Sequence, residues 1–180
     1  VVLRCEARLR AQSALADLDY AFAPLKHARL DYMVQKAVEM GAGRLVPVLT
    51  RHTQASRVNI ERMRANGIEA AEQCGILAVP EVLEPEPFAR WLAGLPAGRR
   101  VVFCDEAATP GDGLAALEDA VRGPLAVAVG PEGGFSEDGR AALLKQSNIV
   151  RLSLGPRILR ADTAAVAALA LIQAVLGDWR

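Results

Sequence analysis

Apolar positions along the chain fall either in short continuous runs or at the spacing of one helix face. Continuous runs at residues 100–104 and 125–129, each followed by a loop, are typical of buried parallel strands. Weaker runs at residues 20–24, 45–49, 79–83 and 149–154 predict further strands. Because proline cannot donate to a ladder, Pro47 places the second of these strands near a sheet edge or at a bulge.

Helical spacing separates these runs. From Leu30 to Val38, apolar side chains recur at positions i, i+3, i+4, i+7 and i+8, which predicts an amphipathic helix that Gly41 ends. Further helices are predicted at residues 59–75, 88–92, 136–146 and 161–176, the third with Ser136 as its N-cap. Strands that alternate with helices predict an α/β domain with a parallel sheet flanked by helices.

The helix at residues 161–176 is apolar on nearly every side. Such a helix must be buried on every side. In a domain of this size, one side can reach the sheet. We therefore expect the other side to meet a second copy of the chain, giving a homodimer through the C-terminal helix.

Composition excludes several classes of protein. Cys5, Cys74 and Cys104 are far apart and form no CxxC pair, so we expect buried thiols in a reducing cytosol rather than disulfides or a zinc site. Two histidines are too few for a metal cluster. The apolar run at residues 164–172 is shorter than the roughly 20 residues of a membrane span, and no signal peptide is visible. These features predict a soluble cytoplasmic protein with no membrane partner.

The formal net charge is zero, but the charges are unevenly distributed. Residues 21–67 hold eight Lys and Arg residues and three acidic ones, whereas residues 68–120 hold three Arg and ten acidic residues. A basic block beside an acidic one favours a local anionic ligand. Two ordinary solvated faces remain an open alternative.

Two loop motifs carry candidate chemistry. The segment GPEGGF at residues 130–135 follows a predicted strand, where glycines let a backbone approach a ligand closely. It is neither a P-loop nor the dinucleotide GxGxxG, and a purely structural turn is the alternative. The segment SLGPRILRADTA at residues 153–164 opens the apolar helix with Arg157, Arg160 and Asp162. Its alternative is a local Arg160–Asp162 pair with Thr163 as the helix cap.

Together these motifs resemble the C-terminal motif pair of the RsmE family. The earlier segments QKAVEMG (35–41), EAAEQCG (69–75) and VPE (79–81), with Lys26 and Pro47, match in order and spacing, from about Leu18 to the C-terminus. The resemblance implies the SPOUT methyltransferase fold, with a deep C-terminal trefoil knot and a homodimer. It also implies methylation of uracil N3 in 16S ribosomal RNA, within the small ribosomal subunit, by S-adenosylmethionine.

The resemblance also implies roles for individual residues. Arg160 would stabilise the uracil anion as the catalytic cation, with Asp162 orienting it or acting as base, and no metal is required. The cofactor would be held by Cys104, Glu106, Gly130, Pro131, Glu132, Gly133, Gly134, Leu152, Leu154, Gly155, Ile158 and Leu159. RNA would be held by Lys26, Arg51, Arg57, Arg62, Arg64 and Arg157, although a solvated helix face is an equal reading for any single one of Arg51, Arg57, Arg62 and Arg64.

Three features depart from the family pattern. The family starts with a PUA-like β-barrel RNA-binding domain, so residues 1–19 are expected to be a remnant or linker of it and residues 20–180 the methyltransferase domain. Ile76 stands where the family commonly has Arg, and Asp162 where it has Glu. The alternatives are another SPOUT RNA methylation, such as ribose 2′-O transfer, and a nucleotide- or RNA-binding module without catalysis.

Overall fold

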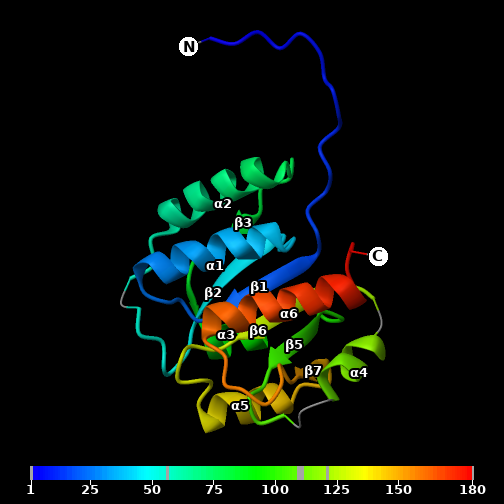
Figure 1. Ribbon diagram of the computed structural model, residues 1–180. Helices are drawn as coiled ribbons and strands as arrows, with labels where there is room; N and C mark the ends of the chain where they lie inside the picture. Colours follow the sequence, from blue (N-terminus) through cyan, green and yellow to red (C-terminus); the bar gives the residue numbers. More distant parts are fainter. Residues whose placement is uncertain (1, 56, 109–111, 121, 180) are drawn as a thin grey trace.

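The computed structural model describes residues 2–55, 57–108, 112–120 and 122–179, and it shows a parallel sheet between two layers of helices (Figure 1). The strands are β1 (Leu18–Phe22), β2 (Arg44–Leu49), β3 (Glu81–Val82), β4 (Glu86–Pro87), β5 (Arg100–Cys104), β6 (Leu125–Val129) and β7 (Ile149–Leu152). Their order is β3-β2-β1-β6-β5-β7, with β4 also paired to β2, and each of these pairings is parallel. The predicted α/β class is confirmed.

The helices divide between the two faces of the sheet (Figure 1). They are α1 (His27–Glu39), α2 (Ile60–Cys74), α3 (Phe88–Ala93), α4 (Asp112–Glu118), α5 (Glu137–Leu144) and α6 (Ala161–Val175). Helices α1, α4 and α6 pack on one face, with α2 beside α1, while α3 and α5 pack on the other. Sequence analysis missed β4 and α4, which are both short.

Side-chain size differs between the two faces of the central strands. Because successive residues point to opposite faces, Tyr20 and Phe22 of β1 face α1 and α6, whereas Ala21 faces the other core. In β6 the valines alternate with Ala126 and Ala128 in the same way. In β1 and β6 the larger side chains therefore lie on the α1–α6 side, where the rings of Tyr20 and Phe22 stack 4.7 Å apart.

Pro47 lies inside the sheet rather than at its edge. On one side Pro47 pairs with Phe22 of β1. On the other side β2 pairs with β3 through Leu45 and with β4 through Val48, so the outer neighbour is interrupted beside Pro47. A residue without an N–H group is tolerated there because no strand faces it on that side. The sequence placed Pro47 near a sheet edge, and the two very short strands that lie outside β2, which are β3 and β4, form that edge.

Local signals set the ends of α2 and α5 as predicted. The Asn59 side chain accepts a hydrogen bond from the amide of Arg62, and Gly75 ends α2 in the left-handed conformation at φ +67°. The Ser136 side chain accepts from the amide of Gly139 at the start of α5. In the described part of the chain, none of the helices combines the length and apolar character needed to cross a bilayer.

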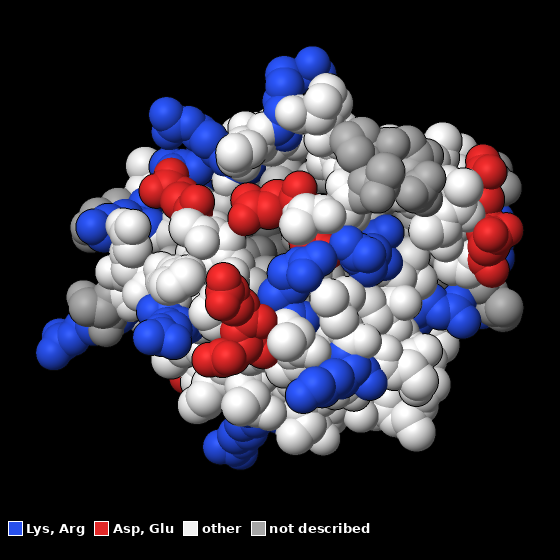
Figure 2. Space-filling view, turned by 90° about the horizontal axis from the view of Figure 1, so that it is seen from below, with Lys and Arg blue, Asp and Glu red and all other residues white. Residues whose placement is uncertain are grey.

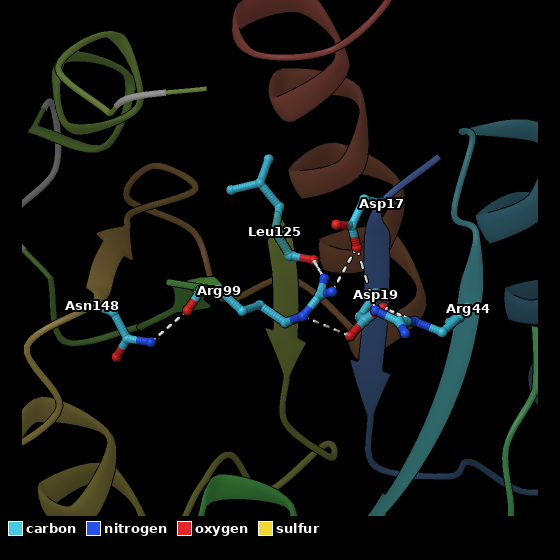
Figure 3. Close-up of polar contacts among 6 residues, drawn as sticks. All are labelled: Asp17, Asp19, Arg44, Arg99, Leu125 and Asn148. Atoms are coloured by element: carbon cyan, nitrogen blue, oxygen red, sulfur yellow. Dashed lines mark hydrogen bonds and ion pairs between the residues drawn. The ribbon is translucent and has the colours of Figure 1, made fainter. Parts of the chain in front are cut away.

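A charged cluster closes the amino-terminal edge of the sheet (Figure 3). The buried Arg99 guanidinium contacts Asp17 and Asp19 at 2.5 and 3.3 Å, and Arg44 donates to Asp19 at 2.5 Å. Burial raises the pKa of Asp19, and the neighbouring guanidinium groups oppose that shift. These pairs join β1 and β2 to the start of β5. The opposite edge of the sheet, at the carboxyl ends of the strands, is formed by loops.

The segment before β1 is extended and mostly exposed (Figure 1). Arg10 donates to the carbonyl of Gly75 at 2.8 Å, and Gln12 donates to that of Leu77 at 3.1 Å. These contacts attach the segment to the end of α2. The expectation of buried thiols is wrong for Cys5 and Cys74, which are exposed because one lies in this segment and the other on the outer side of α2.

Candidate functional site

A cavity of about 410 Å³ opens at the carboxyl edge of the sheet. The loops that follow β5, β6 and β7 form its walls, and the start of α6 forms its floor. These strands are neighbours in the order β6-β5-β7, so their loops meet although they lie far apart in sequence. Ligands of parallel α/β sheets bind at this edge.

All but one of the predicted cofactor residues line this cavity. The exception is Gly133, where an added Cβ would lie 3.7 Å from the His52 side chain, on the outer side of the loop. Ile158 is 86% exposed at the mouth, and Cys104 is half-buried, with burial raising the pKa of its thiol to about 12. At that pKa, Cys104 contributes a neutral thiol to the wall.

The glycine-rich loop at residues 130–134 is held from several sides. The amide of Gly134 donates to the Pro131 carbonyl at 2.8 Å, which closes a turn with Gly134 at φ +66°. His52 Nδ1 lies 3.2 Å from the carbonyls of both Gly133 and Gly134, so it must carry the proton and donate. Phe135 packs edge-on against Phe103 at 5.3 Å. The loop is therefore preformed.

Asp105 connects three parts of the cavity wall. Its carboxylate, which is 1% exposed, accepts from Arg140 of α5 at 2.9 and 3.0 Å and from Arg151 of β7 at 2.9 Å. It also accepts from the amide of Ala107. Burial would raise the pKa of Asp105, but these hydrogen bonds outweigh burial and hold the pKa below its ordinary value. The ionised carboxylate thus fixes the loop after β5.

Arg29 of α1 connects the loop after β6 to the start of α6. Its Nε donates to Asp162 Oδ2 at 2.9 Å, and its Nη1 pairs with Glu132. The hydrogen bond from Arg29 is the main reason why the pKa of Asp162 is lowered. The glycine-rich loop and the first turn of α6 are therefore joined through one guanidinium.

Arg160 is the N-cap residue of α6, and its exposed side chain makes no cap hydrogen bond. Asp162 pairs with Arg29 and accepts from the amide of Thr163, so the local Arg160–Asp162 pair considered above is not seen in the described residues. Arg157 is exposed and is itself one of the residues that line the cavity. Arg160 does not line the cavity, but its neighbours Leu159 and Ala161 do.

The basic block of residues 21–67 is largely neutralised by acidic partners. Arg62 donates to Asp31 at 2.9 and 2.6 Å, Arg64 pairs with Glu61 at 2.5 Å, and Arg51 lies 3.9 Å from Asp138. Figure 2 shows basic and acidic side chains side by side around a hollow. The uneven distribution of charge along the sequence therefore largely disappears in the fold.

Gly113 of α4 allows β7 to approach closely. A Cβ on Gly113 would lie 2.7 and 2.8 Å from the backbone oxygen and nitrogen of Ser153, at the base of the loop after β7. We expect Gly113→Ala to displace that loop and weaken cofactor binding by about tenfold, equivalent to about 1.4 kcal/mol. Calorimetric titration measures the loss.

Gly67→Ala is the matched control, because Gly67 also lies in a helix and its Cβ would meet Pro80 at an ordinary 3.9 Å. This control is expected to bind normally and to be slightly more stable. Equal affinities for both variants would show that Gly113 does not position the loop.

Sequence reasoning missed Arg29, His52, Asp105 and Gly113. Only Asp105 had a local signal, since an acidic residue directly after a buried strand lies at the ligand-binding edge. In the sequence, Arg29 looks like an ordinary polar residue of an amphipathic helix, because its partners Glu132 and Asp162 are 103 and 133 residues away. Long-range pairing of this kind has no signature in a single sequence.

Known proteins resemble the chain over most of its length. A family model described as an RNA methyltransferase domain matches residues 11–173. Ribosomal RNA small subunit methyltransferase E of Rickettsia conorii is 28% identical over 172 residues, covering 95% of the chain and 70% of that protein. The chain spans between 62% and 70% of the length of the first three curated relatives with that name.

Solved structures resemble the fold. The crystal structure of ribosomal RNA small subunit methyltransferase E from Neisseria gonorrhoeae bound to S-adenosyl methionine has a TM-score of 0.77 and 28% identity, covering 91% of this chain and 68% of that one. The SpoU methyltransferase AviRb from Streptomyces viridochromogenes has a TM-score of 0.51 and 21% identity, covering 88% and 60%. The latter is a likeness of fold alone.

Proposed function

Because this chain belongs to the family of RNA methyltransferase domains, we propose that it transfers a methyl group from S-adenosylmethionine to N3 of a uridine in 16S ribosomal RNA. The observation that carries the proposal is the cavity between the loops after β5, β6 and β7. The relatives named ribosomal RNA small subunit methyltransferase E support the ribosomal substrate.

The cavity residues suit the parts of this cofactor. The volume of about 410 Å³ lies within the roughly 300–1,000 Å³ of small-molecule sites. Glu106 and Glu132 bring carboxylates to a ligand with a cationic sulfonium and ammonium, while Leu152, Leu154 and the preformed glycine-rich backbone suit the adenine and ribose. When bound, the cofactor supplies an activated methyl group whose leaving sulfur is already positive, so the transfer requires no metal.

Arg160 is the residue that we assign to catalysis. Uracil N3 becomes nucleophilic when its proton passes to water, and the negative charge then spreads onto O2 and O4. A guanidinium beside those oxygens stabilises the anion. The Arg160 side chain is exposed, makes no cap hydrogen bond and lies between the cavity-lining residues Leu159 and Ala161, so it is available for this role.

Asp162 suits an electrostatic role better than that of a general base. Arg29 holds the pKa of Asp162 below its ordinary value, and a carboxylate with a lowered pKa is a weak proton acceptor near neutral pH. We therefore assign Asp162 to fixing the first turn of α6, and with it the position of Arg160.

The RNA surface that we propose centres on those predicted RNA-binding residues for which no acidic partner is seen in the described part of the chain. These are Lys26 after β1, Arg57 after β2 and Arg157 after β7, all exposed at the carboxyl edge. Arg51, Arg62 and Arg64 contribute after exchange of their acidic partners for phosphate. Such contacts position RNA without reading its sequence.

We further propose a homodimer through α6. The helix buries Ala165, Leu169 and Ile172 against the sheet, while Val166, Ala167, Ala170 and Leu171 remain half-exposed. Val166→Glu is expected to weaken dimerisation by at least about 100-fold, because a two-fold interface would bury the new charge twice. Ile68→Glu, on the exposed surface of α2, is the control. Sedimentation velocity of the unaltered protein showing only monomer at micromolar concentration would contradict the dimer.

The remaining features follow from the same proposal. We propose a trefoil knot in residues 100–180, which suits a chain that adds the outer strand β7 after β6 and then returns with α6 to α1. The methyltransferase domain includes β1 from Leu18, two residues before the predicted boundary, the segment before β1 is a linker, and the protein acts in the cytoplasm on the small ribosomal subunit.

Mass spectrometry of 16S RNA tests the function. Incubation of the protein with small subunits and isotopically labelled S-adenosylmethionine should place one labelled methyl group on a uracil base. A label on ribose would assign the protein to 2′-O transfer instead. Cofactor binding without label transfer to 16S RNA, whether in free form or in subunits, would overturn the proposal.

A further inference from the structure

One cation from outside the three cavity loops joins one of them to the start of α6. Arg29 lies in the first turn of α1, which follows the carboxyl end of β1. Its guanidinium contacts Glu132 in the glycine-rich loop and Asp162 in the first turn of α6. The side chain is 29% exposed, Asp162 17% and Glu132 43%, so the contacts are partly shielded from water.

The two carboxylates would repel each other without this cation. The hydrogen bond from Arg29 lowers the pKa of Asp162, and the same bond raises the pKa of Arg29. A lowered pKa for Asp162 and a raised pKa for Arg29 both mean that the pair stays fully ionised. With Arg29 present the group of three carries one net negative charge, and without it two.

The surroundings of Asp162 contain other buried polar groups. Arg29 Nη2 and the Tyr20 hydroxyl are buried and have no hydrogen-bond partner in the described residues. Burial raises the pKa of Tyr20 well above its ordinary value, with smaller effects from Cys104 and Asp162. Tyr20 therefore stays neutral, and Arg29 is the cation that compensates Asp162.

We propose that Arg29 is a positioning residue, which sets the glycine-rich loop against the start of α6 and limits the negative charge beside the reacting base. The catalytic part of this inference rests on the proposed function, whereas the loop-setting part does not. Glu132 lines the cavity, and Asp162 lies two residues after Arg160. A shift of the guanidinium therefore moves a cofactor contact and the catalytic arginine together.

Arg29→Met tests both parts. It removes the charge while keeping the length of the side chain. We expect affinity for S-adenosylhomocysteine, measured by calorimetry, to fall about tenfold. We expect kcat for methylation to fall about 100-fold, because small misplacements of reacting groups have effects of that size. Arg29→Lys should recover part of both losses, since an ammonium can still pair with one acid.

A second substitution that removes a carboxylate from the Arg29→Met protein separates a positioning role of Arg29 from a simple loss of packing. In the Arg29→Met background, Asp162→Asn removes the extra negative charge at the carboxylate that does not line the cavity, and it should recover at least half of the lost affinity on a logarithmic scale. A simple loss of packing would not be recovered by this second change. Lys36→Met is the matched control, because Lys36 also lies in α1 and pairs with a carboxylate, Glu39 of its own helix. It should leave affinity and kcat unchanged.

Each result bears on one claim. Unchanged S-adenosylhomocysteine affinity in Arg29→Met, or a double variant no better than the single one, overturns the positioning role. If affinity falls and recovers as expected while the unaltered protein methylates no RNA, the positioning role stands and the proposed function fails. If Arg29→Met does not fold, Arg29→Lys with and without Asp162→Asn provides the same comparison.

Discussion

Arg160→Met is expected to lower methyl transfer by about 100- to 1,000-fold while leaving cofactor affinity unchanged. That range is typical for removal of one preorganised group that stabilises an anion. Stability should be unaffected, because the exposed Arg160 side chain does not cap α6 and Asp162 is held by Arg29 instead. Single-turnover methylation of small subunits, together with calorimetry, measures the two quantities separately.

Arg157→Met is the matched comparison for Arg160. Both guanidinium groups are exposed in the loop that leads into α6. If Arg157 binds phosphate, its loss should raise KM and flatten the salt dependence of RNA binding, with little change in kcat. A kcat for Arg160→Met within threefold of the unaltered protein would remove Arg160 from the chemistry.

Asp105→Asn is expected to destabilise the fold and to weaken cofactor binding at once. The buried carboxylate accepts from two guanidinium groups and one amide, and an amide side chain cannot accept all of these bonds. Breaking a buried pair costs about 3–5 kcal/mol. Arg140 and Arg151 are 35% and 42% exposed and can turn to water, so we expect the lower end, about 3 kcal/mol.

This change should lower Tm by about 6–12 °C in a chain of this size. Glu84→Gln is the control, since Glu84 is 77% exposed and lies 3.8 Å from Arg64, and it should not move Tm. A fall of less than about 2 °C for Asp105→Asn would show that the carboxylate contributes little to stability.

Acid should reduce the difference between the unaltered protein and Asp105→Asn. The pKa of Asp105 is lower in the folded protein than its ordinary value, so its contribution to stability is complete above the unfolded pKa of about 3.9. It is lost as the pH falls through the folded pKa. Denaturant titrations at pH 7 and pH 3 should therefore show the smaller gap at pH 3.

Much of the sheet could be predicted from the sequence because its central strands are buried on both faces. The runs at residues 100–104 and 125–129 match β5 and β6 at both ends, since a strand covered by helices on each side is apolar without interruption. The short α4 was missed because only Leu117 of its two leucines is fully buried, and Leu114 is 47% exposed. One anchoring side chain gives no helical period to detect.

The site was predicted as far as it depends on loops that follow strands. The parallel sheet brings those loops to one edge, so motifs there converge without further information. The count of charges along the sequence favoured an anionic ligand without showing that Arg62 and Arg64 are paired with acidic side chains. Their partners Asp31, Glu61 and Glu84 occupy them in the fold. Which cations are paired is decided by tertiary packing, which a count along the sequence cannot register.

The pairing of β1 with β6 also bears on how the chain folds during its synthesis. Leu18 pairs with Leu125, so one edge of β1 has no neighbour until the chain beyond residue 125 has been made. An open edge of a strand that is mostly apolar can pair with other chains. We therefore expect nascent chains that stop before β6 to aggregate or to recruit chaperones, and the complete chain to fold slowly, because contacts between such distant segments form late.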